Sequence, residues 1–275
     1  STPSESNISI ISRFPIIETY DYNLYGIGVD LLISNSDTIK FVSSHLTAYP
    51  YGPYDLYEGI SVEEVISNEL STRYLENLDI YNQIINHPLN NPNLPVIYVG
   101  DHNTPSLLDW GNDNINQNFG FEIDWPVSEF LLNNGFYDSY RAVYPYVNDN
   151  IGLTWSPGYP KNTFDSSDVH DRIDMIYFKH GYIQNLYPLE SYAYDCDPWP
   201  SDHRAVITEF AVCSNMNIGD INLDGIINIL DITMLVNELL YSSNLYCIHV
   251  YGDFDYNQEL NILDIIHLVN FILYN

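Results

Sequence analysis

The sequence predicts a mixed α+β protein, in which β-sheets pack face to face with helices outside them, followed by a small all-α module. Residues 1–213 contain short apolar runs of strand length, separated by long loops rich in Tyr and Pro. Residues 219–275 contain two copies of another pattern, a polar loop followed by an apolar stretch at helical spacing. We therefore divide the chain into a larger domain at 1–213, a linker at 214–218 and a module at 219–275.

The elements of the larger domain follow from the spacing of its apolar residues. Runs that favour strands lie at 8–11, 26–33, 39–43, 96–99, 175–178 and 205–210. Helical spacing appears at 62–85 and 127–133. The segment YPYGPYDLY at 49–57 would suit a wall that stacks on a ring of a substrate. Because Tyr and Pro at this density more often form a rigid surface loop, we prefer the surface loop.

The formal net charge is -29 at pH 7, which is extreme for a chain of this length. Residues 1–213 hold 29 Asp and Glu against all 8 Lys and Arg, a net -21, and residues 214–275 hold 8 acids and no Lys or Arg, a net -8. Proteins that bind nucleic acid draw much of their affinity from Lys and Arg at the phosphates. Tight, unaided binding to a duplex is therefore disfavoured, although a nucleic-acid substrate is not excluded.

The chain ends and the cysteines give further expectations. No apolar run reaches the roughly 18 to 20 residues that a membrane span needs, so no span is predicted. The chain begins with neither Met nor a basic, apolar leader, so we expect position 1 to be a processed, excised or truncated end. Three cysteines are too few for a disulfide scaffold. Cys213 and Cys247 bracket the first copy of the repeat, which suits a disulfide in an oxidising exterior and would leave Cys196 free.

The two copies of the repeat each carry the oxygen ligands of a twelve-residue calcium loop. The copies GDINLDGIINILDITMLVNELLY, from Gly219, and GDFDYNQELNILDIIHLVNFILY, from Gly252, align without a gap. Loop positions 1, 3, 5, 7 and 12 are Asp220, Asn222, Asp224, Ile226 and Asp231 in the first copy and Asp253, Asp255, Asn257, Glu259 and Asp264 in the second, where position 7 acts through its backbone carbonyl. Gly225 stands at the sharp turn of the first loop, but the second has Gln258 there, which is expected to weaken the second site. A pair of Asp- and Asn-rich helix caps is the alternative, although a cap needs one oxygen and not five in register.

Residues 219–275 resemble a dockerin module, because each loop ends in Asp at position 12, one helix follows each loop, and two copies stand in tandem. The resemblance implies two bound Ca²⁺ ions, antiparallel loop helices, and docking to a cohesin on another protein in a secreted assembly. The family's recognition positions fall at Ile229, Leu230, Ile262 and Leu263, which are apolar here instead of hydroxyl-bearing. The expected partner is therefore a cohesin-like protein or a surface scaffold, with attachment inside the same chain as the alternative. The expected location is secreted, either extracellular or attached to a cell surface.

Polar residues that support catalysis lie at four predicted strand ends. They are His45 in FVSSHLTAYP, Asp101 and Asn103 in VIYVGDHN, Asp174 in DRIDMIYF, and Asp202 and His203 in WPSDHRAVITEF. Each alone is common where a strand turns. Together they supply three carboxylates, one amide and two imidazoles, the set that a metal-assisted attack of water on a phosphoester requires.

With these motifs in view, residues 1–213 resemble the endonuclease/exonuclease/phosphatase superfamily, the deoxyribonuclease I-like metal hydrolases. The matching motifs are SRFPI, SSHL, GDHNTPSLLDW, TWSP, DRIDMIYF and WPSDHRAV, which begin at Ser12, Ser43, Gly100, Thr154, Asp171 and Trp199 in family order. The resemblance implies a four-layer α/β/β/α sandwich, incomplete at its N-terminus, with the site at the strand ends. It implies a phosphodiesterase or phosphatase that depends on Mg²⁺ or Mn²⁺.

The resemblance also assigns roles to the turn after the central strand and to the strand beside it. Asp101 would orient and activate the attacking water, and Asn103 would hold the phosphate or that water. His45 would face the phosphate or the leaving group. His102 stands where the family more often has Phe, so a packing position has become polar.

The remaining roles fall near the end of the domain. His203, helped by Asp174, would contact a non-bridging phosphate oxygen, while Asp202 would bind the magnesium ion and orient His203. The family's principal magnesium ligand is a Glu on a strand before the SRFPI motif, and this sequence begins downstream of it. We therefore expect the chain as given to be close to inactive, either as a fragment of a longer gene product or as a degenerate hydrolase. The leading interpretation is a secreted phosphoester hydrolase, and the alternative is a non-catalytic phosphate-binding or scaffold protein.

Overall fold

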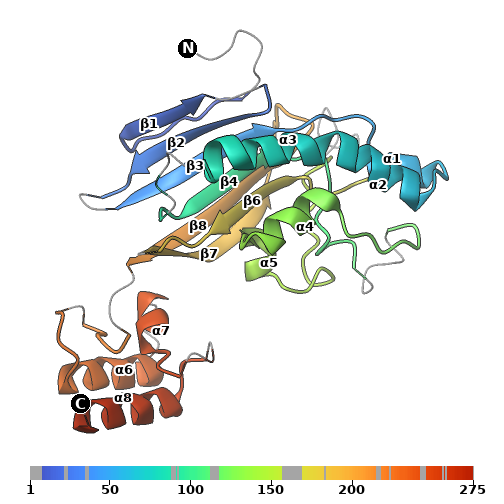
Figure 1. Cartoon of the computed structure of the whole chain (residues 1–275). Coiled ribbons are helices and arrows are strands. Elements are labelled where there is room, and N and C mark those ends of the chain that lie inside the picture. The colour runs from blue at the N-terminus through green and yellow to red at the C-terminus, as the bar shows by residue number, and fades with distance from the viewer. Residues whose placement is uncertain are drawn as a thin grey trace. The chain divides into compact units, whose positions relative to one another are not determined.

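A computed structural model of the chain divides into two compact units (Figure 1). Unit 1 comprises Ser1–Gly181 and Pro188–Glu209, and unit 2 comprises Tyr182–Tyr187 and Phe210–Asn275. The structure describes residues 8–21, 24–34, 37–87, 91, 93–111, 118–156, 169–182, 184–214, 218–222, 224–241, 246–255, 257 and 259–274. Gln258 of the second predicted calcium loop and residues 215–217 of the predicted linker lie outside these ranges.

A six-stranded mixed sheet forms the centre of unit 1 (Figure 1). Its strand order is β1 (Ile16–Asp21), β2 (Gly26–Leu32), β3 (Thr38–His45), β4 (Val96–Asp101), β6 (Asp174–Lys179) and β5 (Tyr137–Asp138). The β3–β4 pair is parallel, and the other pairs are antiparallel. The carboxyl ends of β3 and β4 therefore meet the amino end of β6 at one edge of the sheet.

Most strands fall on the predicted apolar runs, because these runs supply the buried faces of the sheet. In β2, six of seven residues are buried. The strand predicted at 8–11 is wrong, since these residues form no strand and the edge strand is instead β1. A short connection joins β1 to β2, so only the residues just before it can pair with β2 in a hairpin.

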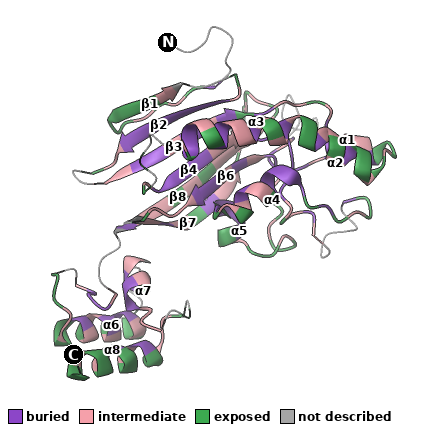
Figure 2. Ribbon diagram, in the orientation of Figure 1, coloured by how far each residue is buried: buried purple, intermediate pink, exposed green. Residues whose placement is uncertain are grey.

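Helices cover one face of the sheet (Figures 1 and 2). They are α1 (Gly52–Tyr57), α2 (Val62–Ser71), α3 (Arg73–Ile80), the π-helical turn Tyr81–Ile85, α4 (Pro126–Asn133) and α5 (Ser139–Val143). The core between the layers joins Val42 and Tyr98 of the sheet to Ile80 of α3 and Leu131 of α4. The helical spacing predicted at 62–85 is confirmed as α2, α3 and the π-helical turn, with a division at Thr72, whose φ of -124° and ψ of -100° are not helical. The surface loop preferred at 49–57 is also wrong, because most of this segment forms α1.

Two further strands form a separate two-stranded sheet, β7 (Gln184–Tyr194) and β8 (Ala205–Ser214). The sequence predicted β8 but not β7. In β7, Pro188 interrupts the apolar run. Proline lacks a backbone N–H and is tolerated in strands that have an open edge. The described residues of unit 1 thus confirm a mixed α+β fold, while the four-layer arrangement stays a prediction.

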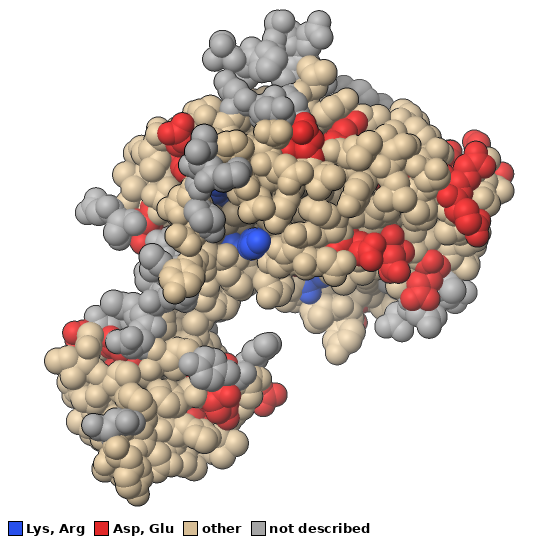
Figure 3. All heavy atoms as spheres, viewed as in Figure 1, with Lys and Arg blue, Asp and Glu red and all other residues tan. Residues whose placement is uncertain are grey.

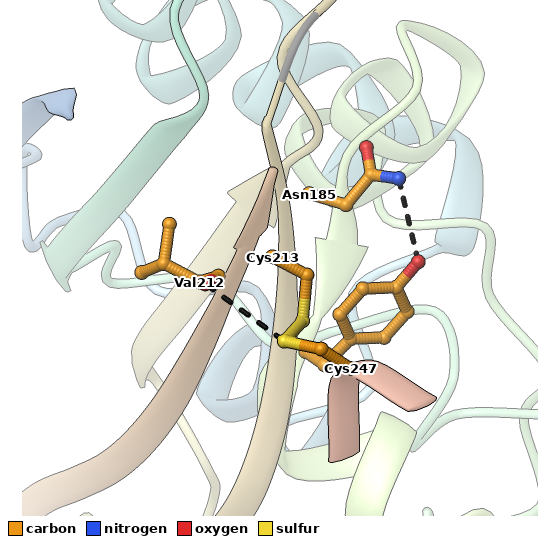
Figure 4. Close-up of a disulfide and its surroundings, with 5 residues drawn as sticks. Asn185, Val212, Cys213 and Cys247 are labelled. Carbon is orange, nitrogen blue, oxygen red and sulfur yellow. Dashed lines mark hydrogen bonds between the residues drawn. A yellow bond between two sulfur atoms is a disulfide. The ribbon is translucent and has the colours of Figure 1, made fainter. Parts of the chain in front are cut away.

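The described residues of unit 2 form the helices α6 (Ile229–Tyr241), α7 (Tyr246–Gly252) and α8 (Ile262–Tyr274). Leu235 of α6 and Leu268 of α8 are fully buried in its core. Figure 4 shows the disulfide between Cys213 and Cys247, which confirms the predicted pair. Cys196 is free and exposed, as predicted. None of the helices in the described ranges is both long enough and apolar enough to cross a membrane.

Candidate active site

Three of the predicted site residues lie in one row across neighbouring strands. His45 ends β3 and Asp101 ends β4, and the parallel register pairs them directly. Asp101 is paired in turn with Asp174, the first residue of β6. Residues directly opposite one another point to the same face of a sheet, at about 5 Å from strand to strand. Accordingly, Nε2 of His45 lies 3.7 Å from Oδ2 of Asp101.

His203 completes the row from the segment that precedes β8. Its Nδ1 lies 2.8 Å from Oδ2 of Asp174, and its Nε2 lies 3.9 Å from Oδ2 of Asp101. The backbone of His203 pairs with Trp155, which pairs also with Asp171 just before β6. The indole of Trp199 donates a hydrogen bond of 2.6 Å to the His203 carbonyl. The imidazole is therefore held by contacts on both its side chain and its backbone.

The turn after β4 explains the spacing of the sequence Gly-Asp-His-Asn. A side chain at Gly100 would place its Cβ 2.0 Å from the carbonyl oxygen of Ser44, so only glycine lets β4 approach β3 here. Asn103 has a φ of +50°, a conformation that Asn tolerates better than most residues. Its backbone N–H donates to Oδ1 of Asp101 at 2.9 Å, and its Nδ2 donates to the Leu46 carbonyl at 2.8 Å. The turn thus fixes the Asp101 carboxylate and the Asn103 amide together.

His102, between these two residues, points into the core. It is fully buried, and its ring stacks on that of Tyr177 and lies tilted against that of Tyr98. Burial lowers the pKa of His102 to about 3, so the ring is neutral at physiological pH. It therefore packs as a flat neutral ring and takes no place in the row.

The environment of the row raises the pKa of two of its groups, the carboxyl group of Asp101 and the imidazole of His203. Burial and the nearby charge of Asp174 raise the pKa of Asp101 to about 7. Burial lowers the pKa of His203, but the hydrogen bond to Asp174 and the charges of Asp174 and Asp101 outweigh it and raise that pKa to about 9. His203 therefore carries a positive charge at neutral pH.

Carboxylate oxygens of Asp101 and Asp174 and a ring nitrogen of His203 lie within 4.8 Å of one another, which is the spacing of a potential metal site. While His203 is protonated, the two carboxylates are the ligands that this group offers. The three side chains are 17%, 21% and 25% exposed, so an ion from solvent can reach them. Asp202 is exposed and is not part of this group, although its charge acts on both Asp101 and His203. The assignment of magnesium to Asp202 therefore stays a prediction.

The row opens into a pocket of about 220 Å³. Its lining consists of His45, Ala48, Tyr49, Tyr51, Tyr54, Asp101, Asn103, Trp155, Ile173 and His203. Four of these ten residues are aromatic, and none is Lys or Arg. The segment at 49–57 thus contributes a wall of the pocket.

A buried arginine holds this wall in place. Arg73, in α3, is fully buried and pairs with the carboxylate of Glu69, in α2. Its guanidinium also donates to the carbonyls of Thr47, Ala48 and Pro50. Nothing in the sequence identified Arg73, because a single Arg on a helix is usually exposed. Its role depends on the path of the loop after β3, which brings three carbonyls to Arg73 of α3.

A second buried network holds the start of β6. Arg172 pairs with Asp109 and with Asp138, and Arg141 also pairs with Asp109. Oγ1 of Thr154 accepts the backbone N–H groups of Ile173 and Asp174, each at 3.0 Å. Asp109 in the motif GDHNTPSLLDW and Thr154 in TWSP are thus structural supports for Asp174. The sequence motifs alone predicted no role for Asp109 or Thr154.

In unit 2 the two repeat loops have matching hydrogen bonds. Asp231 is fully buried, and its carboxylate accepts the backbone N–H groups of Ile221, Asn222 and Asn228. Asp264 is also fully buried and accepts those of Phe254, Asp255 and Asn261, each 33 positions further along the chain. Gly225 has a φ of +84°, as the sharp turn of the first loop requires. Carboxylate oxygens of Asp253, Asp255 and Asp264 lie within 4.8 Å of one another.

Comparison with known proteins gives distant similarities. No family model matches this chain. Among curated proteins, an uncharacterized protein of Caenorhabditis elegans is 26% identical over 224 residues, which cover 74% of this chain and 69% of that protein. An AP endonuclease from Archaeoglobus fulgidus is a similar solved structure, at 16% identity and a TM-score of 0.42 over 74% of this chain and 70% of that chain.

Two further solved structures are longer than the matched region. TDP2 from D. rerio, complexed with a single-strand DNA product, is 14% identical with a TM-score of 0.39 over 68% of this chain. An endonuclease/exonuclease/phosphatase from Beutenbergia cavernae is 12% identical with a TM-score of 0.40 over 68% of this chain. This chain spans 61% of the first and 39% of the second. The function is therefore inferred from the site itself.

Proposed function

We propose that unit 1 is a metal-dependent phosphoester hydrolase of the endonuclease/exonuclease/phosphatase type, with a four-layer sandwich as its full architecture. The observation that carries the proposal is the row of His45, Asp101 and Asp174, completed by His203 at the mouth of a pocket. This set combines ligands for a divalent ion with a carboxylate and imidazoles that can orient water and move a proton. The order of six sequence motifs along 1–213 supports the same class.

Asp101 would act on the attacking water. A group whose pKa lies near the working pH is suited to general base catalysis, and the pKa of Asp101 is raised to about 7. The amide of Asn103, fixed by the same turn, would hold the phosphate or the water. His45, whose side chain is 43% exposed, would face the leaving group.

His203 would stabilise the negative charge that develops on the phosphoryl oxygens. Its hydrogen bond to Asp174 orients the imidazole and keeps it protonated, so that Nε2 can donate to a non-bridging oxygen. Asp202, next to it in sequence, would add negative charge at the mouth and serve as the predicted magnesium ligand. Its exposure suits contact with a hydrated ion.

The donor set of the row fits magnesium or manganese. Both ions prefer carboxylate oxygens, which Asp101 and Asp174 supply, and both bind with several waters retained. When bound, such an ion supplies Lewis-acid polarisation of a phosphoryl oxygen. Burial and the nearby charge of Asp174 raise the pKa of Asp101, and a bound cation would offset that charge.

A small phosphoester is the favoured substrate over nucleic acid. Asp and Glu clusters dominate the charged side chains on the face seen in Figure 3, where Lys and Arg are few. A polyanion would be repelled by such a surface, whereas a single phosphate needs only local compensation.

A non-catalytic phosphate-binding protein is the second candidate. It is favoured by the composition of the potential metal group, which in the described residues holds two carboxylates and one imidazole.

An assay of phosphoester hydrolysis distinguishes the hydrolase from the phosphate-binding protein. The chain is incubated with bis(4-nitrophenyl) phosphate and Mg²⁺ or Mn²⁺, with EDTA as the control. Release of 4-nitrophenolate that EDTA stops supports the hydrolase, while phosphate binding without any release supports the second candidate.

We further propose that unit 2 is a calcium-binding module of the dockerin type, with its boundaries at 219–275. The matching hydrogen bonds of the two loops support two Ca²⁺ sites, because each loop turns its acidic side chains toward its own backbone. Ile229, Leu230, Ile262 and Leu263 are each about half exposed or more, which suits contact with a cohesin-like protein or a surface scaffold. The disulfide between Cys213 and Cys247 supports a secreted or cell-surface location.

A further inference from the structure

We infer that the pocket beside the row selects phosphate esters that carry one aromatic ring and one phosphate group. This inference rests on the proposed function of unit 1 and names the substrate class of the same site. Three properties of the pocket support it: the nature of its walls, its size, and the lack of Lys and Arg among the described residues that line it.

The walls of the pocket are largely aromatic. Tyr49, Tyr51 and Tyr54 come from one segment, and Trp155 comes from the segment that pairs with Asp171 and His203. Among the described residues, Ala48 and Ile173 add apolar lining. Aromatic pairs in edge-to-face or offset geometry contribute about 0.5 to 1.5 kcal/mol beyond their buried area. A flat ring therefore gains contacts here that an aliphatic group of equal size does not.

The size of the pocket admits one ring. A cavity of about 150 Å³ suffices to bind benzene, and this pocket measures about 220 Å³. The difference leaves room beside the ring for the phosphate at the row. Pockets for larger, drug-sized ligands start at about 300 Å³, so two rings or a polymer would not be enclosed.

The charge of the lining limits the number of phosphates. None of the ten lining residues is Lys or Arg, and Asp101 is among them. Positive charge at the row would come from a divalent ion held by Asp101 and Asp174, which suits a single phosphate. A second phosphate would meet no Lys or Arg among the described residues that line the pocket.

The aromatic wall is also preorganised. The hydroxyl of Tyr51 donates a hydrogen bond of 2.7 Å to the buried carboxylate of Asp171, and the ring of Tyr54 packs edge-on against that of Tyr51. The loop that carries Tyr49 is held at three carbonyls by Arg73. Because these rings are already ordered, ligand binding costs little conformational entropy there, and the energy of the ring contacts contributes to affinity.

The test compares two ligands of equal charge and similar size, phenylphosphonate and cyclohexylphosphonate. Their C–P bonds are not hydrolysed, so isothermal titration calorimetry with Mn²⁺ and saturating Ca²⁺ reports binding apart from turnover. We expect the full chain to bind phenylphosphonate about threefold to tenfold more tightly than cyclohexylphosphonate. Equal affinities, or no binding of either ligand, would overturn the inference.

Variants locate the selectivity in the wall. Tyr49→Leu and Tyr54→Leu keep apolar contact but remove a ring, so each should reduce affinity for phenylphosphonate about threefold to tenfold and leave cyclohexylphosphonate nearly unchanged. Tyr49 is 70% exposed, so its substitution leaves the core intact. The control is Tyr146→Leu, at an exposed tyrosine outside the pocket, which should change neither affinity. Equal losses for both ligands in the Tyr49 and Tyr54 variants would contradict selection by the rings.

The outcome is separable from that of the proposed function. Selective binding of phenylphosphonate by a chain that hydrolyses no phosphoester would sustain the inference and reject the hydrolase. Hydrolysis of phosphoesters by a chain that binds the two phosphonates equally would sustain the hydrolase and reject the inference.

Discussion

The acids of unit 1 and those of unit 2 are brought together in different ways. In unit 1, Asp101 and Asp174 come from strands far apart in the sequence and meet because β4 and β6 pair in one register. In unit 2, Asp253, Asp255 and Asp264 come from a single loop and meet because its turns fold them inward. The site of unit 1 therefore depends on the whole sheet, and each site of unit 2 depends on twelve residues.

This difference extends to what balances the negative charge. Asp231 and Asp264 each accept three backbone N–H groups and are fully buried without a cationic side chain. Asp101 accepts the backbone N–H of Asn103 and also lies beside the imidazoles of His45 and His203. The acids of unit 2 are thus oriented by backbone N–H groups of their own repeat, whereas Asp101 and Asp174 of unit 1 are oriented largely by imidazoles from other strands and loops.

The largest effect is expected from neutralising the centre of the row. Asp101→Asn keeps the size of the side chain but removes the charge and the basic group, so we expect turnover of a phosphoester to fall by about 10²- to 10⁴-fold. His203→Ala should have a similar effect, because it removes charge stabilisation at the phosphate. Steady-state kinetics with Mn²⁺ and bis(4-nitrophenyl) phosphate measure both. Glu63→Gln, at an exposed acid of α2, is the matched control, and turnover in the Asp101 variant equal to that of this control would refute the assigned role.

The dependence of unit 1 on long-range contacts is tested at Arg73. Arg73→Met leaves the buried carboxylate of Glu69 without its partner, and we expect the free energy of unfolding to fall by about 3 to 5 kcal/mol. The double variant Arg73→Met/Glu69→Met removes both charges and should recover much of that loss. Urea denaturation followed by tryptophan fluorescence gives both values. A double variant no more stable than the single one would mean that the carbonyl contacts of Arg73, and not the ion pair, carry its effect.

Calcium removal tests the local nature of the sites in unit 2. A ligand that binds only the folded state at 100 times its dissociation constant stabilises it by about 2.7 kcal/mol. We therefore expect EGTA to lower the melting temperature of unit 2, monitored by helical circular dichroism, while the unfolding of unit 1 stays unchanged. Asp231→Ala should abolish the first site and Asp264→Ala the second, as calorimetric calcium titration would report. A circular-dichroism melt that EGTA does not shift would speak against calcium binding.

The smallest effect concerns the pH dependence of a support residue. Burial raises the pKa of Asp171 from 3.8 to about 6, although hydrogen bonds from Tyr51 and Trp110 lower it. Because the folded pKa lies above the unfolded one, the stability from this group is fully present below about pH 4 and is lost as pH rises through 6. Asp171→Asn does not titrate, so relative to the wild type it should gain about 1 to 3 kcal/mol between pH 4 and pH 8. Urea titrations at the two pH values give this difference, and a constant offset would show that Asp171 does not titrate as described.

Local features of the molecule were predictable from sequence, and contacts between distant segments were less so. The calcium-loop pattern from Asp220 to Asp231 recurs from Asp253 to Asp264, and its hydrogen bonds recur with it, because short-range turns determine both. His45, Asp101 and Asp174 were singled out as strand-end residues, but only the register of β3, β4 and β6 brings them into one row. The resemblance to a known family supplied that grouping in advance.

The missed features share one physical cause. The strand β1, the helix α1 and the buried Arg73 depend on partners that lie elsewhere in the chain, so periodicity and composition do not reveal them. The Tyr-rich segment at 49–57 has the composition of a surface loop, yet Arg73 and Asp171 hold it against the pocket. Residue types that favour a loop can thus form a wall when tertiary contacts fix them.

Manganese binding tests most directly whether the acids of unit 1 form a ligand site as distinct from the loops of unit 2. The full chain is titrated with Mn²⁺ in the presence of saturating Ca²⁺, which would occupy the proposed loop sites, and free Mn²⁺ is followed by its electron paramagnetic resonance signal. We predict one bound Mn²⁺ that Ca²⁺ does not displace, present in the wild type and in Glu63→Gln but lost in the double variant Asp101→Asn/Asp174→Asn. Equal Mn²⁺ binding by the wild type and the double variant, or no binding by either, would contradict a metal site at the row.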